Sequence, residues 1–123
     1  MSLRGLVDDL DRYPPFVRVD ELASDATAQG VDVHADLGMH AVTVSRIKRS
    51  TTNPMLVLTA TGSGAEDMAA AIGDFAPDVN VATFPSWETL PHERLSPSFD
   101  TVGRRTHLLR RIAHADPLSL IHI

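Results

Sequence analysis

The sequence contains no cysteine, which excludes disulfide bonds and metal sites built on thiolates. Aromatic residues are also scarce, at 5% of the chain. No apolar run approaches the roughly 20 residues that a membrane-spanning helix needs, and the first residues turn acidic too early for a secretory signal. The composition that remains, 43% apolar and 22% charged over 123 residues, is typical of one globular domain. We therefore expect a cytoplasmic protein.

Basic residues are missing from a long central stretch. Residues 50–93 contain no lysine or arginine, whereas five arginines lie between residues 94 and 111. A net charge of −5 argues against a dedicated nucleic-acid binder, because phosphate contacts need a basic footprint. The candidates for a DNA or partner contact are Arg104, Arg110 and Arg111.

Hydrophobic periodicity predicts helices and strands along the whole chain. We expect short helices at residues 3–12 and 20–29, separated by two prolines, a weak strand at 31–35 and a helix at 39–49. Residues 55–60 form a continuous apolar run that is typical of a strand covered on both faces. A further strand is expected at residues 79–84 and a last helix at 100–114.

A capped helix is expected between the two later strands. Ser63 and Glu66 have capping-box spacing. An apolar stripe follows at Ala65, Met68, Ala69, Ile72 and Phe75. Strand, helix and strand in this order imply a right-handed βαβ unit. The sequence therefore predicts an α/β fold with a three-layer open parallel sheet, in the form of a degenerate P-loop-NTPase or helicase-like domain that is incomplete at its C-terminus.

The same pattern predicts how the chain divides. Residues 1–30 are expected to form an N-terminal helical segment, and residues 31–117 a partial motor-like α/β domain. The last six residues, 118–123, resemble the translation of a sequencing-library adaptor, so we interpret them as a non-native tail.

Two segments resemble phosphate-binding loops without meeting their requirements. Residues 38–45 have the frame G-x-x-x-x-G-K-[ST], with Gly38 and Ser45 at its ends. Thr43 replaces the second glycine, and Val44 replaces the lysine that holds the β- and γ-phosphates. Residues 62–67 approach the dinucleotide fingerprint, but an aspartate takes the place of its third glycine. We expect a non-functional loop, no catalytic residue, no metal site and no cofactor in this chain.

Residues 84–101, here called the Trp87 segment, contain three prolines and the only tryptophan. The segment is longer than an ordinary loop, which favours a function or docking against its own domain. Two interpretations stay open: its apolar residues pin it to the domain, or its Trp and Pro surface recognises a partner. The candidate residues in and just after it are Trp87, Glu88, Pro91, Glu93, Arg94, Asp100 and Arg105.

The last predicted helix has an apolar arc and a basic arc. The expected core face consists of Val102, Leu108, Leu109, Ile112 and Ala113. Arg105 falls within this arc, where a charge is costly without a partner. We therefore predict that it pairs with a carboxylate, from Glu88, Glu93 or Asp100, and ties the Trp87 segment to the helix.

The run at residues 84–105, FPSWETLPHERLSPSFDTVGRR, closely resembles the N-terminal region of bacterial transcription-repair coupling factors of the actinobacterial type. The flanks agree, with PMLVLTAT at residues 54–61, AEDM at 65–68 and LLRRIAH at 108–114. The resemblance covers residues 5–117 and is strongest from Pro54 onward. Gly62 and Gly64 depart from the charged residues that are usual in the family.

The resemblance implies a large parent protein, an ATP-dependent DNA translocase that displaces stalled RNA polymerase and recruits nucleotide excision repair. ATP and magnesium would bind in its downstream domains. Its N-terminal part is similar to the damage-recognition component of the excinuclease, the excinuclease B protein, and includes a motor-like domain without working ATPase motifs. The implied partners are the downstream domains of the same chain, RNA polymerase, the excinuclease A protein and double-stranded DNA, with no membrane. This chain would be a non-catalytic scaffold or regulatory module; the alternatives are a weak DNA-contacting module and a small nucleotide-binding hydrolase domain.

Overall fold

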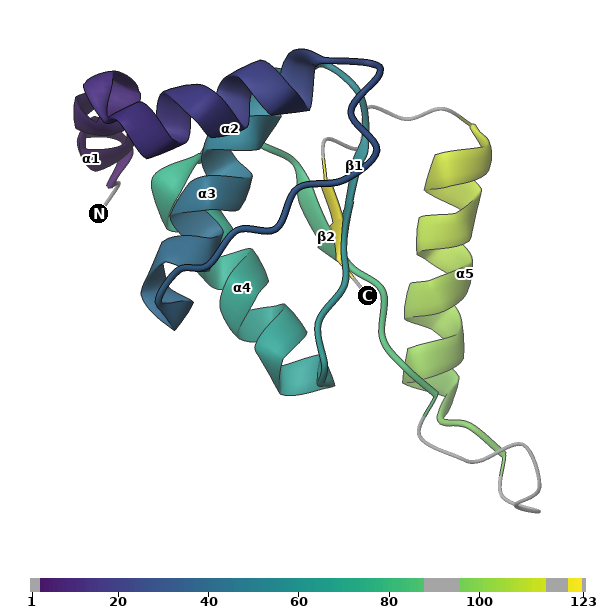
Figure 1. The fold of residues 1–123 in the computed structure, drawn as a ribbon. Helices are drawn as coiled ribbons and strands as arrows, with labels where there is room; N and C mark the ends of the chain where they lie inside the picture. Colours follow the sequence, from purple (N-terminus) through teal and green to yellow (C-terminus); the bar gives the residue numbers. More distant parts are fainter. Residues whose placement is uncertain (1–2, 88–95, 115–119, 123) are drawn as a thin grey trace. The chain divides into compact units, whose positions relative to one another are not determined.

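The computed structural model describes residues 3–87, 96–114 and 120–122 (Figure 1). The helices are α1 (Arg4–Asp9), α2 (Pro14–Ser24), α3 (Leu37–Arg49), α4 (Gly62–Phe75) and α5 (Phe99–Ala113), and a 3₁₀-helix η1 (Leu10–Arg12) follows α1. The strands are β1 (Met55–Val57), β2 (Val81–Thr83) and β3 (Leu120–His122), each of three residues. Helices therefore dominate the part of the chain that the structure describes.

The expected three-layer open parallel sheet is wrong. The described strands are short, and β1 and β2 pair in parallel with β3 rather than with each other (Figure 1). The apolar run at residues 55–60 is a strand only as far as Val57, and its Leu56 and Leu58 side chains are exposed. A run that solvent reaches cannot be the interior strand of a sheet covered on both faces. The helix-rich chain is consequently not the P-loop-NTPase or helicase-like domain that the sequence pattern indicated.

The central strand β3 comes from the six-residue tail that we interpret as non-native. Leu120 lies opposite Met55 of β1 and opposite Val81 of β2. The pairing of β1 and β2 into one sheet thus depends on β3, which lies between them. The non-native origin of residues 118–123 stays a prediction.

The chain forms two compact units, and the division falls within α4. Unit 1 comprises Met1–Asn53 and Ala70–Val79, and unit 2 comprises Pro54–Ala69 and Asn80–Ile123. The sequence-based division after residue 30 stays a prediction.

Unit 1 is built on α1, α2 and α3, with α1 and α2 both packed against α3. The fully or nearly buried apolar side chains of this unit are Val7, Phe16, Ala41, Val42, Ile72 and Ala76. Helix α2 begins at the two prolines, where their missing N–H groups cost nothing, and it ends before residue 25. The predicted helix at 20–29 is therefore shifted, and residues 31–35 are not a strand.

In unit 2, hydroxyl groups cap the helices. At the start of α4, Thr61 Oγ1 accepts a hydrogen bond from the Gly64 N–H at 3.1 Å. Ser63 already lies inside α4, so the predicted cap at Ser63 is wrong by two residues. At the start of α5, Ser98 Oγ accepts a hydrogen bond from the Thr101 N–H at 3.2 Å. Both caps satisfy backbone donors that the helix itself leaves free.

Candidate functional site

The strongest candidate site in unit 2 is centred on Arg105. Its guanidinium carbon lies 4.0 Å from the centroid of the Phe84 ring and 4.2 Å from that of the Trp87 ring. The guanidinium also donates a hydrogen bond to the backbone carbonyl of Pro85. A planar cation over two electron-rich ring faces is stabilised by the ring quadrupoles. Arg105 therefore ties the start of the Trp87 segment to α5.

The expected partner was a carboxylate of Glu88, Glu93 or Asp100, and a pairing of Arg105 with Glu88 or Glu93 stays a prediction. Among the described residues, no carboxylate pairs with Arg105, and Asp100 lies in the first turn of α5. Glu88, Pro91, Glu93 and Arg94 lie outside the described residues. Among the described residues, the guanidinium of Arg105 contacts the Pro85 carbonyl oxygen and the rings of Phe84 and Trp87.

The buried face of α5 also differs from the expected core face. Thr101 and Leu108 are buried, whereas Val102, Leu109 and Ile112 are exposed. The two buried residues are seven apart and lie on one side of the helix, next to the side that the periodicity favoured. The expectation for Leu108 is confirmed, whereas the other four residues of the expected core face, Val102, Leu109, Ile112 and Ala113, are exposed.

A cavity of about 290 Å³ lies beside the Arg105 site within unit 2. Its walls come from residues 58–61 between β1 and α4, from the first turns of α4, from Thr83 at the end of β2 with residues 84–86 after it, and from Arg104 of α5. Arg104 donates a hydrogen bond to Thr83 Oγ1 at 3.1 Å. Glu66 adds a carboxylate to the lining, which opposes the binding of a phosphate group.

The candidate phosphate loop at residues 38–45 lies inside α3. Thr43 Oγ1 donates a hydrogen bond to the Met39 carbonyl at 2.8 Å, one turn earlier in the same helix. The Ser45 side chain is fully buried. Val44, which replaces the lysine, continues the helix. A phosphate loop lies between a strand and a helix, so this segment does not have the backbone form of one.

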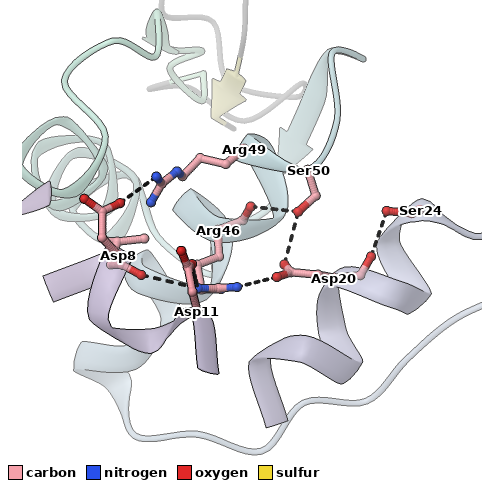
Figure 2. A network of polar contacts seen from close by, with 8 residues as sticks. Asp8, Asp11, Asp20, Ser24, Arg46, Arg49 and Ser50 are labelled. Atoms are coloured by element: carbon pink, nitrogen blue, oxygen red, sulfur yellow. Dashed lines mark hydrogen bonds and ion pairs between the residues drawn. The ribbon is translucent and has the colours of Figure 1, made fainter. Parts of the chain in front are cut away.

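A network of polar contacts in unit 1 is centred on Arg46 of α3 (Figure 2). Arg46 is 6% exposed and forms ion pairs with Asp11 at 2.6 Å and with Asp20. It also donates a hydrogen bond to the Val7 carbonyl, and its guanidinium lies 5.3 Å from the Phe16 ring centroid. One side chain thereby joins α1, η1 and α2 to α3.

The carboxylates around Arg46 raise its pKa. Burial disfavours the charged guanidinium, but hydrogen bonds and charges from Asp20 and Asp11 outweigh it and raise the pKa of Arg46. A second pair joins Arg49 to Asp8 at 2.6 Å on the exposed side of α3. Arg46 therefore stays charged, and its buried pairing has a structural role.

Sequence reasoning missed Arg46, although a signal was present. Arg46 lies four residues after Val42, on the buried stripe of α3. A charge inside an apolar stripe calls for a partner, which is the argument that singled out Arg105. Three aspartates in the preceding helices, Asp8, Asp11 and Asp20, could have been proposed as its partners.

Three further features concern metal binding, membrane spanning and the basic residues of α5. Within residues 3–87 and 96–114, no group of three or more His, Asp or Glu side chains could hold a metal ion. None of the described helices is both long and apolar enough to cross a membrane. Arg110 is exposed on α5, and Arg111 is half-buried.

Comparison with known proteins supplies the family relationship. No family model matches the chain. Over 67 residues, 54% of the chain, the sequence is 58% identical to the transcription-repair-coupling factors of Mycobacterium bovis and Mycobacterium tuberculosis. The match spans 5% of the length of each relative. The resemblance indicated by residues 84–105 is thereby confirmed, and over this stretch the chain is similar to a small segment of the bacterial transcription-repair-coupling factors.

Proposed function

We propose that this chain is a non-catalytic scaffold or regulatory module of a transcription-coupled DNA repair factor. The observation that carries the proposal is the 58% identity over 67 residues to the mycobacterial transcription-repair-coupling factors. In this proposal the longer protein is an ATP-dependent translocase that acts on double-stranded DNA and on stalled RNA polymerase. Its other domains bind ATP and magnesium and contact the excinuclease A protein, and this module works without a cofactor of its own in the cytoplasm.

The chemistry of the described site supports a non-catalytic role. The unit 2 cavity is lined by hydroxyl, small and apolar side chains, together with Arg104 and Glu66. Nucleophilic catalysis requires a nucleophile within hydrogen-bond reach of a base, and phosphoryl transfer requires cations around the phosphates. The single arginine of this lining is offset by a carboxylate and bonded to Thr83. Positioning a partner requires none of these groups.

The first test concerns nucleotide binding. We expect that titration of the 123-residue chain with ATP and Mg²⁺ in a calorimeter gives no saturable heat at micromolar concentrations. The control is the same titration with the variant Glu66→Lys, which adds the missing cation to the cavity lining. Micromolar binding by the unmodified chain would contradict the scaffold role and favour a nucleotide-binding domain.

The second test concerns repair. The 67 matching residues of a mycobacterial coupling factor are replaced by those of this chain, and strand-specific repair is measured in cells. We expect the chimera to retain repair, whereas a chimera carrying a scrambled stretch of the same composition loses it. Loss of repair in a stable chimera that still hydrolyses ATP would show that this chain does not perform the module's role.

A further inference from the structure

The exposed side of α5 carries an apolar stripe, here called the α5 face. It consists of Phe99, Val102, Leu109 and Ile112, which are 97%, 38%, 54% and 44% exposed. The spacing of three, seven and three residues places them along one side of the helix over almost its whole length. Large apolar side chains gathered on a surface mark a site of interaction with another molecule.

The Trp87 ring lies at the edge of this stripe. Arg105, which holds the ring at 4.2 Å, is three residues after Val102 and four before Leu109, so it lies beside both of them on the helix surface, next to Ile112 at the margin of the stripe. Trp87 is 50% exposed. An aromatic ring fixed by a cation and half open to solvent is typical of the residues that dominate binding energy at interfaces.

The charge beside the α5 face is positive. Arg110 is exposed one residue after Leu109, and Arg105 borders the opposite edge of the stripe. The acidic residue of α5 is Asp100, which lies in its first turn. A partner that covers the stripe thus meets arginines along both edges, and acidic side chains at those positions would be attracted.

We propose that the α5 face docks an amphipathic helix whose apolar side covers the stripe and whose flanking positions are acidic. The stripe has the length and periodicity of a helix, which matches the packing of one apolar helix face against another. The proposal rests on the exposed residues of unit 2 and does not depend on the proposed repair function. Four large apolar side chains are unfavourable against a phosphate backbone, which favours a protein partner over DNA.

The test uses the 123-residue chain and synthetic helical peptides, each about four turns long and without tryptophan. The acidic probe has leucines at positions i, i+3, i+7 and i+10 with glutamates at the flanking positions; the basic probe has lysines instead, and a third peptide has the acidic composition in scrambled order. Because the chain has a single tryptophan, the emission of Trp87 reports contact directly. We expect saturable binding of the acidic probe with a blue shift of that emission, and about tenfold weaker binding of the basic probe.

Variants of the chain locate the site. We expect Leu109→Gln and Ile112→Gln each to weaken binding of the acidic probe by about five- to tenfold, and Arg110→Glu to reverse the preference toward the basic probe. His107→Gln, at an exposed position on the other side of α5, is the matched control and should bind as the unmodified chain does. Because all four side chains are exposed, far-ultraviolet circular dichroism should be the same for every variant.

Three outcomes would overturn the proposal. The first is equal affinity of the chain for the acidic and scrambled peptides. The second is binding of a short DNA duplex that requires Arg110 and is not weakened by Leu109→Gln, and the third is a concentration-dependent dimer that Leu109→Gln dissociates while no peptide binds. The second would assign the surface to DNA, and the third to another copy of the chain.

Discussion

The guanidinium of Arg105 lies over the ring of Trp87, 4.2 Å from the ring centroid, although the two residues are 18 positions apart in the sequence. The same guanidinium contacts the Phe84 ring and donates a hydrogen bond to the Pro85 carbonyl. A single side chain of α5 thus holds three residues at the start of the Trp87 segment.

Replacement of Arg105 tests this tie. Arg105→Met removes the cation and the donor, so we expect a red shift of Trp87 emission, faster quenching by acrylamide and a loss of about 1–2 kcal/mol in unfolding free energy. Arg105→Lys keeps the charge but lacks the planar stacking group, so it should recover only part of the emission shift. Arg104→Met is the neighbouring control. Unchanged quenching in Arg105→Met would show that the segment is held by other contacts.

The buried cluster of unit 1 predicts a contrast between two arginines of α3. Arg46→Met leaves Asp11 and Asp20 without their shared cation, and we expect a loss of about 2–4 kcal/mol, moderated by the exposure of Asp11. Arg49→Met breaks an exposed pair with Asp8 and should cost at most about 1 kcal/mol. Urea unfolding followed by circular dichroism measures both. Similar losses in the two variants would contradict the structural role of Arg46.

The start of α4 predicts a contrast between two glycines. A Cβ added at Gly64 would lie 3.1 Å from Thr61 Oγ1, the atom that caps the helix, whereas one added at Gly73 meets nothing within 4 Å. Gly73→Ala should therefore stabilise the helix by about 0.5–1 kcal/mol through helix propensity. Gly64→Ala should stabilise the helix by less than this or destabilise it. Thermal unfolding of the two variants measures the difference. An equal gain in stability in both variants would show that the Thr61 side chain can move aside without loss of stability.

A carboxylate just after α2 predicts a local dependence on pH. The Thr27 hydroxyl and the Thr27 N–H both donate to Asp25 Oδ1, at 2.6 and 2.8 Å, and they lower the pKa of the Asp25 carboxyl. A depressed folded-state pKa contributes stability above the ordinary value near about 4, and this contribution is lost as the pH falls through the folded-state pKa. Carbon-detected NMR titration should show the depression in the unmodified chain.

Substitution of the donor supplies the control for that titration. Thr27→Val removes the hydroxyl donor, so the pKa of Asp25 should rise toward its ordinary value. Thr52→Val changes an exposed threonine elsewhere and should leave the Asp25 titration as it is. An Asp25 pKa that is the same in Thr27→Val and in the unmodified chain would refute the hydrogen-bond origin.

Local patterns predicted several elements well. The helices expected at residues 39–49 and 100–114 correspond to α3 and α5, and the expected apolar stripe lies on α4, because an apolar side chain every three or four residues is specific to a helix. The strands fared worse. Residues 55–60 have the composition of an interior strand, but a strand needs pairing partners, and these lie elsewhere in the chain. The fold class inferred from those strands was wrong for this reason.

The sequence by itself determined the positions of α3 and α5, the absence of thiol chemistry and the resemblance to transcription-repair-coupling factors at residues 84–105. Only the tertiary structure decided which side of α5 is buried and what Arg46 and Arg105 contact. The contacts of these two arginines span 18 to 39 positions, from Trp87 to Arg105 and from Val7 to Arg46. Helical periodicity relates only residues within a few turns, so a side chain's long-range partner is set by packing between elements.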